Sequence, residues 1–559
     1  MTMPWVCWKR ALTIAGLFAV PAAAELQNVE VGGKIEIYGA WFSDFFEVDG
    51  ATRIPDLFLF GRPIGPGGTF SGIRAGDGGN NLGFLEQRAR LHVSADFTDH
   101  VKAFVEFDTS DTWGTDFQSN YITGVDFRHD TTNGIEVHQG YIEASEIFGS
   151  PITARIGRQE LEFGSGWMVG ADPGPDPFAG LSFDAIRLTY ETEAFTIDAW
   201  WSKLSENGAA EEDGDIDFYG IYGTFRESGL MSGKDPMVLQ PAVMPIRFFY
   251  QGLTRLGPFR GRSAPTDELV EFNVYWMFVR DGVNRESTSF IRPVERIEDL
   301  LGLDDYQGTR LHTAGTRGAG SYSGFDWEVE AAYQWGEADS VGSLFAAVGR
   351  LYSDTDAKFG NWGGHAEVGY TLDTEWAPRI FLGGSYYGGE DNRDISFGEW
   401  LQGFFATPDA SISFNRMFSS WREDAFLDGG SMSNFWKAYL GVTVAPTEKI
   451  EIGATVTYLE AIDEFDSPPS IKIGGGYLPL TSVFSFLTRP GSKDLGTQAS
   501  IWVAYQYAED LTIEAGWSHY FTGEAISDGI FVLDNGMTFF GGRGHDDADY
   551  FYFYTSLEF

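Results

Sequence analysis

The sequence predicts an all-β protein: a transmembrane antiparallel β-barrel of about 18 strands, of the bacterial outer-membrane type. Three observations support this prediction. Apolar and polar residues alternate along many segments, the gaps between these segments are short and long in turn, and the last segment ends on the aromatic residue Phe559. Outer-membrane barrels combine alternating strands with short periplasmic turns and long outer loops.

The alternation has a period of two residues. One segment puts Leu85 and Leu91 on one face and Arg88 and Arg90 on the other. This period predicts strands with one apolar face. A β-sandwich would show the same period, but it has no reason to sort its loops by length. The rhythm of the gaps therefore favours a barrel.

The expected strands lie near residues 31–43, 82–97, 101–113, 134–146, 152–161, 182–190, 195–205, 216–227, 268–282, 309–321, 325–337, 361–372, 378–388, 435–446, 449–460, 499–507, 512–521 and 548–558. With both ends of the chain on the periplasmic side, every long gap but one faces outward. The exception is the Arg-containing segment 228–267, for which a long periplasmic turn, a plug or two further strands are alternatives.

The first 24 residues have the form of a secretory signal peptide. Lys9 and Arg10 precede an apolar run of about ten residues, too short for a spanning helix, which needs roughly 20. Small residues ending at Ala24 follow. Residues 25–559 are expected to form one barrel. The single cysteine, Cys7, lies in the signal segment, so disulfides, cysteine zinc sites and haem attachment are not expected in the remainder.

Composition excludes several classes of function. The chain has 38 Lys and Arg residues against 81 Asp and Glu residues, and no basic tract, so nucleic acid is not an expected partner. No HExxH or GxSxG motif is present, and neither an enzyme activity nor a bound metal or cofactor is expected.

The last strand suggests how the barrel reaches its membrane. Alternating residues end on Phe559, which resembles the signal that bacterial barrel-assembly machinery reads. The expected surroundings are therefore outer-membrane lipid and lipopolysaccharide.

Several blocks resemble the alginate-export family of outer-membrane barrels. They are "FLEQRARLHVSADFTDHVKAFVEFDTSDTWG", "GRQELEFGSGWMVG", "SFDAIRLTY" and "FDWEVEAAYQWGEA", and the resemblance is best over residues 82–400. It implies a monomeric barrel of 18 strands with an Arg-lined constriction that passes a polyuronate or related solute. The residues carried over to the lumen are Arg88, Arg90, Arg158 and Arg187.

Parity supports a lumen position for three of these arginines, but not for Arg158. Arg158 shares parity with Ile156, which reads as lipid-facing. We expect a bulge at Gly157 to turn Arg158 inward, because an arginine facing lipid at the midplane would cost roughly 2–4 kcal/mol. The alternative is that Arg158 lies at the membrane interface and pairs outside the bilayer. Asp184, expected near the rim, is a candidate to fasten the base of the loop.

Carboxylates outnumber arginines on the expected lumen face and argue against a polyanionic cargo, since charged rings set the sign preference of a pore. The lumen-lining candidates among them are Glu86, Asp96, Glu106, Asp108, Glu271, Glu328 and Glu330.

Three functions follow. The first is an alginate-export-like channel that passes a polar solute, an anionic polysaccharide or oligosaccharide among the candidates. The second is a general or cation-preferring porin. The third is a barrel that sheathes a periplasmic cytochrome or secretion partner. The sequence leaves open the solute, the direction of transport and whether a loop enters the lumen, for which 44–81 and 389–434 are long enough.

Overall fold

A computed structural model describes much of the chain. The described residues are 27–43, 47–52, 70–74, 82–114, 117–120, 125–128, 134–171, 178, 180–206, 216–226, 269–281, 309–337, 357–389, 410–424, 426–427, 432–462, 470–473, 476–479, 492–525, 532–534, 537–539 and 547–559. The expected signal segment and the whole of the segment 228–267 lie outside them. No helix among the described residues is long and apolar enough to cross a membrane.

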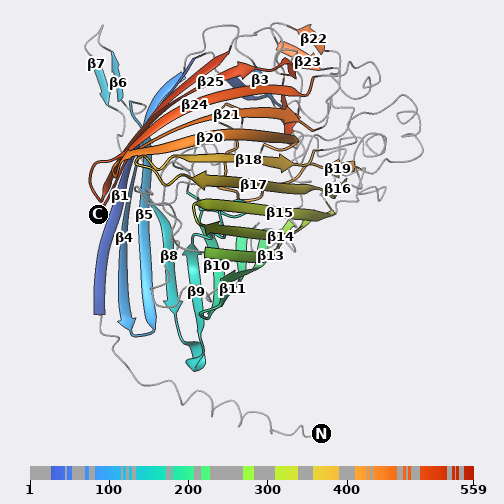
Figure 1. Ribbon diagram of the computed structural model, residues 1–559. Helices are drawn as coiled ribbons and strands as arrows, with labels where there is room; N and C mark the ends of the chain where they lie inside the picture. Colours follow the sequence, from blue (N-terminus) through green and yellow to red (C-terminus); the bar gives the residue numbers. More distant parts are fainter. Residues whose placement is uncertain are drawn as a thin grey trace, which may run out of the picture.

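Eighteen long antiparallel strands in the described residues close into a barrel (Figure 1). They are β1 (Gln27–Ser43), β4 (Leu82–Thr98), β5 (Val101–Thr112), β8 (Glu136–Ala144), β9 (Ile152–Gln159), β10 (Phe183–Glu191), β11 (Phe195–Ser205), β12 (Ile216–Arg226), β13 (Leu269–Asp281), β14 (Thr309–Tyr322), β15 (Phe325–Glu337), β17 (Trp362–Thr371), β18 (Arg379–Tyr387), β20 (Phe435–Thr447), β21 (Ile450–Ala461), β24 (Asp494–Gln506), β25 (Leu511–Thr522) and β28 (Ala548–Glu558).

The ring closes between the first strand and the last. β1 pairs with β4 on one side and with β28 on the other, with Lys34 opposite Glu558. Closure removes the free sheet edges, which leaves no row of unpaired backbone groups facing lipid. The predicted fold class is therefore confirmed, with both ends of the strand sequence at the same rim.

Shorter strands accompany the barrel. β16 (Ala357–Phe359) and β19 (Ala410–Ile412) extend its sheet between β15 and β20. The others form small separate sheets in the long connections: β2 (Glu47–Thr52), β3 (Phe70–Arg74), β26 (Val532–Asp534) and β27 (Met537–Phe539); β6 (Phe117–Asn120) with β7 (Val125–Arg128); β22 (Ser470–Ile473) with β23 (Gly476–Pro479).

All 18 predicted strands correspond to observed ones. The largest difference is β24, which begins at Asp494 instead of near 499. Its first residues, "DLGTQ", lack an apolar alternation, and Gly496 has a φ of +132°. The backbone nevertheless pairs with β21 and β25 there, with a register shift at Leu459 and Glu460. The strand is longer than predicted because its backbone pairs with β21 and β25, and local composition does not reveal this pairing.

Side-chain burial alternates along the strands as the period predicted. In β28, Tyr550, Tyr552 and Tyr554 are buried, whereas Phe551 and Leu557 are exposed. The exposed apolar face is the one that meets lipid, and the buried face points into the barrel.

Glycines lie directly opposite inward aromatic residues on neighbouring strands. The Trp502 indole covers Gly453, which is its register partner, so that a Cβ on Gly453 would overlap the ring. The same pairing recurs for Gly220 with Trp200, Gly315 with Tyr275, Gly383 with Tyr439 and Gly516 with Tyr552. An aromatic ring laid over a glycine packs the inner wall without widening it.

We expect Gly453→Ala to destabilise the barrel by about 1–3 kcal/mol, because the buried Trp502 ring must leave its rotamer. Urea unfolding in detergent, followed by tryptophan fluorescence, measures the change. The matched control is Gly134→Ala, where an added Cβ has no heavy atom within 4 Å. Equal stability of the two variants would contradict the packing role of Gly453.

Candidate functional site

Two of the long connections between strands fold back into the barrel. We call residues 160–182 the first inserted segment and residues 413–434 the second inserted segment, and describe only their placed residues. In the first, the Phe163 ring stacks 4.5 Å from Trp200 and 5.1 Å from Tyr222, both inward residues of the wall. Trp167 is buried and donates its indole N–H to Tyr387 Oη at 2.6 Å. The sequence predicted an outer loop here, and apolar "GWMV" is the signal that places it inside.

The second inserted segment touches opposite sides of the wall. Phe418 packs against Phe183 and Phe218, at 5.2 and 5.0 Å between ring centroids. Phe426 packs 5.2 Å from Tyr520, and the ring of Trp421 lies 4.2 Å from His365. Contacts to β10, β12, β17 and β25 require the segment to cross the lumen. It belongs to the long gap 389–434, one of the two that are long enough to enter.

The inserted segments also bind each other. Val169 and Phe418 form a parallel bridge, and the backbone N–H of Gly170 donates to the Phe418 carbonyl at 2.8 Å. Trp421 donates its indole N–H to the Ser165 carbonyl, also at 2.8 Å. Their aromatic residues and the inward aromatic residues of the wall form one buried apolar cluster.

A buried ion pair fixes the second inserted segment to the wall. Lys437 of β20 lies 2.7 Å from Glu423, and the two side chains are 3% and 0% exposed. Ser385 Oγ and Tyr387 Oη also donate to this carboxylate. Burial, the largest single influence, raises the pKa of Glu423. The charges of Lys437 and Arg416, with the hydrogen bonds from Lys437 and Tyr387, outweigh burial and hold the pKa below its usual value.

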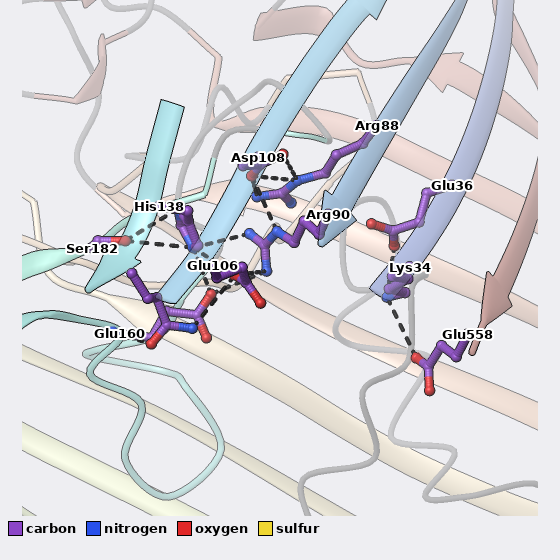
Figure 2. Close-up of polar contacts among 11 residues, drawn as sticks. Lys34, Glu36, Arg88, Arg90, Glu106, Asp108, His138, Glu160, Ser182 and Glu558 are labelled. Carbon is purple, nitrogen blue, oxygen red and sulfur yellow. Dashed lines mark hydrogen bonds and ion pairs between the residues drawn. The ribbon is translucent and has the colours of Figure 1, made fainter. Parts of the chain in front are cut away.

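A polar cluster, the Arg90 cluster, lines the wall at β4, β5 and β8 (Figure 2). Arg88 binds Asp108 with Nε and Nη2, at 2.8 and 2.5 Å from Oδ2. Arg90 reaches the same carboxylate with Nε at 3.1 Å, and its Nη1 lies 3.1 Å from Glu160 and 3.8 Å from Glu106. Arg88 and Arg90 thus lie where they were predicted, already shared among carboxylates.

His138 completes the Arg90 cluster. Its Nε2 lies 2.7 Å from Glu160 and 3.1 Å from Arg90 Nη2, and the Ser182 hydroxyl lies 3.1 Å from Nδ1 and 3.4 Å from Nε2. Burial raises the pKa of Glu160. The hydrogen bond with His138 and the charge of Arg90 act in the opposite direction and leave the pKa below its usual value. Glu160 and Ser182 stand at the two ends of the first inserted segment.

A second polar cluster gathers around Arg317 of β14. Its guanidinium binds Glu328 through two contacts of 2.9 Å and Glu271 at 2.8 Å, and Nε lies 4.0 Å from Glu330. His365 Nε2 lies 3.2 Å from Glu328. Glu271, Glu328 and Glu330, predicted separately along two strands, are therefore brought together.

Other predicted residues lie along the wall. Arg187 is 2.8 Å from Asp198, and Glu86 accepts a weak hydrogen bond from Thr112 at 3.4 Å. Asp96, half-buried, is the register partner of Lys102. Their contact with a solute stays a prediction.

The expectation for Arg158 is wrong. Its side chain is 49% exposed on the outer face and binds Asp184, with 2.9 Å between Nε and Oδ1. β9 pairs with β8 and β10 without a register shift at Gly157, so no bulge rotates Arg158 inward. The inward residue is its neighbour Gln159, which is fully buried. The pair with Asp184 compensates the charge of Arg158 on the outer face.

Parity did not single out Arg317, Arg379 and Lys437. Arg317 lies in the Gly- and Thr-rich stretch "HTAGTRGAG" of β14, where neither face is distinctly apolar. Arg379, which binds Asp326 and Glu367 at 2.5 and 2.7 Å, is the first residue of β18. Lys437 shares its face with Phe435 and Tyr439, which the period alone assigns to lipid. The signal that could have found Lys437 is a lone cation within an aromatic face.

We expect Lys437→Met to loosen the second inserted segment, because removing one partner of a buried pair costs about 3–5 kcal/mol. Trypsin cleavage after the buried Arg416 reports this opening, and its rate should rise at least about tenfold. Lys203→Met is the matched control, since the Lys203 side chain is 26% exposed and its pair with Asp217 spans 3.5 Å. Equal cleavage rates in both variants would contradict an anchoring role for Lys437.

Acid should release the same segment only at low pH. Because the folded pKa of Glu423 is depressed, its stabilising contribution is complete above the ordinary value of 4.5 and is lost as pH falls through the lower folded value. Single-channel conductance should therefore stay constant from neutral pH down to about pH 4.5 and rise below it. A Glu423→Gln channel should lack this acid step. An acid step unchanged in that variant would assign it to other groups.

Comparisons with known proteins identify the family. No curated protein matches this chain. Among solved structures, Pseudomonas aeruginosa OccK8 (OprE) aligns at a TM-score of 0.44 and 10% identity, covering 95% of this chain and 98% of that chain. Acinetobacter baumannii OccAB3 aligns at 0.44 and 8%, covering 95% and 100%. The family model described as "Alginate export" matches residues 72–232 and 270–531, well over half of the chain. The chain belongs to the alginate-export family of outer-membrane β-barrel channels.

Proposed function

We propose that this channel passes small cationic or neutral polar solutes, and that anionic polysaccharide is not its cargo. The observation that carries the proposal is the pairing of the inward arginines. Arg88, Arg90, Arg187, Arg317 and Arg379 each lie within 3.1 Å of at least one carboxylate.

These contacts are geometrically well formed. Arg317 and Arg379 each use two guanidinium nitrogens on one carboxylate, the bidentate arrangement that is strongest for arginine. A polyuronate carboxylate would have to displace such a partner to bind, and would leave the displaced carboxylate buried without its cation. Breaking a buried pair is strongly unfavourable.

The residual charge is negative. In the Arg90 cluster, two arginines meet Glu106, Asp108 and Glu160; around Arg317, one guanidinium meets Glu271, Glu328 and Glu330. The whole chain carries a formal charge of −43. Since charged rings set the sign preference of a pore, this excess favours cations and disfavours a polyanion.

The inserted segments oppose passage of a polymer. They cross the lumen, bind each other and are anchored by buried contacts such as the Glu423–Lys437 pair. A polysaccharide of many units needs a continuous passage as wide as the polymer, which the two segments obstruct, whereas a small solute needs a narrower one. The barrel therefore acts as a selective channel for small solutes.

Reversal potentials in planar bilayers test the proposal. In a salt gradient we expect the sign that reports cation preference, and no block by soluble polyuronate. Glu271→Gln should lower the cation preference because it removes a lumen carboxylate, whereas Asp373→Asn in the exposed turn between β17 and β18 should leave it unchanged. Anion preference, or block by polyuronate at low concentration, would restore the export of an anionic polysaccharide.

A further inference from the structure

We propose that Glu106, His138 and Glu160 form a binding site for a divalent transition-metal ion, with the Arg90 guanidinium as the resident cation that moves aside. One ligand atom of each residue lies within 4.8 Å of the others. The set consists of one imidazole nitrogen and two carboxylates, which suits zinc and its neighbours. The proposal concerns binding alone and stands independently of the solute that the channel passes.

The spacing fits a metal ion. Bonds of about 2.1 Å in a tetrahedral zinc site place ligand atoms roughly 3.4 Å apart. His138 Nε2 lies 2.7 Å from Glu160 Oε1 and 4.0 Å from Glu106 Oε1, values that bracket this spacing. Side-chain shifts of under about 1 Å would bring all three ligands to bonding distance. A fourth position stays open to water.

Glu106 is the independent observation that points to a cation. Its side chain is only 10% exposed, yet its described contacts are long: 3.5 Å to the Gln139 amide, 3.8 Å to Arg90 and 4.0 Å to His138. Its nearest described cation, Arg90, is 3.8 Å away, and a buried carboxylate that lacks a close, well-formed ion pair is costly. Figure 2 shows it directed toward Arg90 and His138, where a cation would complete its coordination.

Neighbouring side chains hold the ligands in place. Gln139 donates to Glu106 Oε1 and accepts from the backbone N–H of Glu160 at 3.2 Å, so one side chain positions two ligands. The closer contact of Ser182 is to His138 Nδ1, at 3.1 Å, which leaves Nε2 directed at the carboxylates. Such outer partners orient metal-binding side chains.

Arg90 would compete with a metal ion for the three ligands, and Asp108 offers its guanidinium an alternative partner. Its guanidinium contacts His138 and Glu160, but its Nε also lies 3.1 Å from Asp108. Rotation of the terminal nitrogens would free the ligands and keep the Asp108 pair. A bound metal would then join β5 and β8 to the start of the first inserted segment through Glu160.

The second cluster of the described residues with this composition, Glu328, Glu330 and His365, is less suited. Both oxygens of Glu328 are engaged by Arg317, and the His365 ring is covered by Trp421 at 4.2 Å. It provides a matched control, because it offers the same side chains on the same inner wall.

The test is titration of the refolded full-length channel in detergent with Zn²⁺ alone by calorimetry and with Co²⁺ alone by visible absorption. We expect one site whose affinity falls at least about tenfold in His138→Gln and in Glu160→Gln, and is unchanged in His365→Gln. Arg90→Gln should bind more tightly, by about fivefold or more, because a competing positive charge is removed. Heat-dependent gel mobility and circular dichroism establish folding of each variant.

Glu160 follows the last residue of β9, so its substitution does not alter a barrel strand. Glu160→Gln therefore tests the site even if His138→Gln, a change within β8, does not fold. Loss of binding in His365→Gln with retention in Glu160→Gln would overturn the assignment. Weaker binding in Arg90→Gln would do the same, since it would show that Arg90 supports the site instead of competing with a metal.

Discussion

The sharing of inward guanidinium groups among carboxylates of neighbouring strands is the interaction on which the channel depends. Arg317 joins β13, β14 and β15 through Glu271 and Glu328, and Arg379 joins β15, β17 and β18 through Asp326 and Glu367. These contacts cross the same strand boundaries as the backbone ladder. They therefore join neighbouring strands of the wall, and in the proposed function they also set the sign of charge that a solute meets.

The inserted segments depend on the same wall. If the inner face carried only charged residues, the inserted segments would have no apolar surface to pack against. Where the segments lie, however, aromatic residues of the strands point inward. Phe163 lies on Trp200 and Tyr222, and Phe426 on Tyr520. The barrel thus has an apolar core inside it, with buried pairs such as Glu423–Lys437 fixing how the second segment lies. We expect a channel filled in this way to select its solutes by size as well as by charge.

Local periodicity was sufficient to predict the strands, because each strand must present an apolar face to lipid whatever the rest of the chain does. The same rule failed where the lumen is itself apolar: Lys437 shares a face with Phe435 and Tyr439. It was correct about the parity of Arg158, and the family pattern that turned Arg158 inward was wrong, since Asp184 compensates it outside. Pairings such as Arg317 with Glu271, separated by 46 residues, need the register of the strands. The signal segment, residues 228–267 and the expected partners stay predictions.

The most direct measurement is the single-channel conductance and ion selectivity of a barrel in which residues 413–427 are replaced by a short flexible linker. If the second inserted segment occupies the lumen and the charge that selects ions resides on the strands, conductance should increase several-fold while cation preference persists. An unchanged conductance would contradict the insertion of the segment. A larger conductance with anion preference would contradict the role assigned to the carboxylates of the wall.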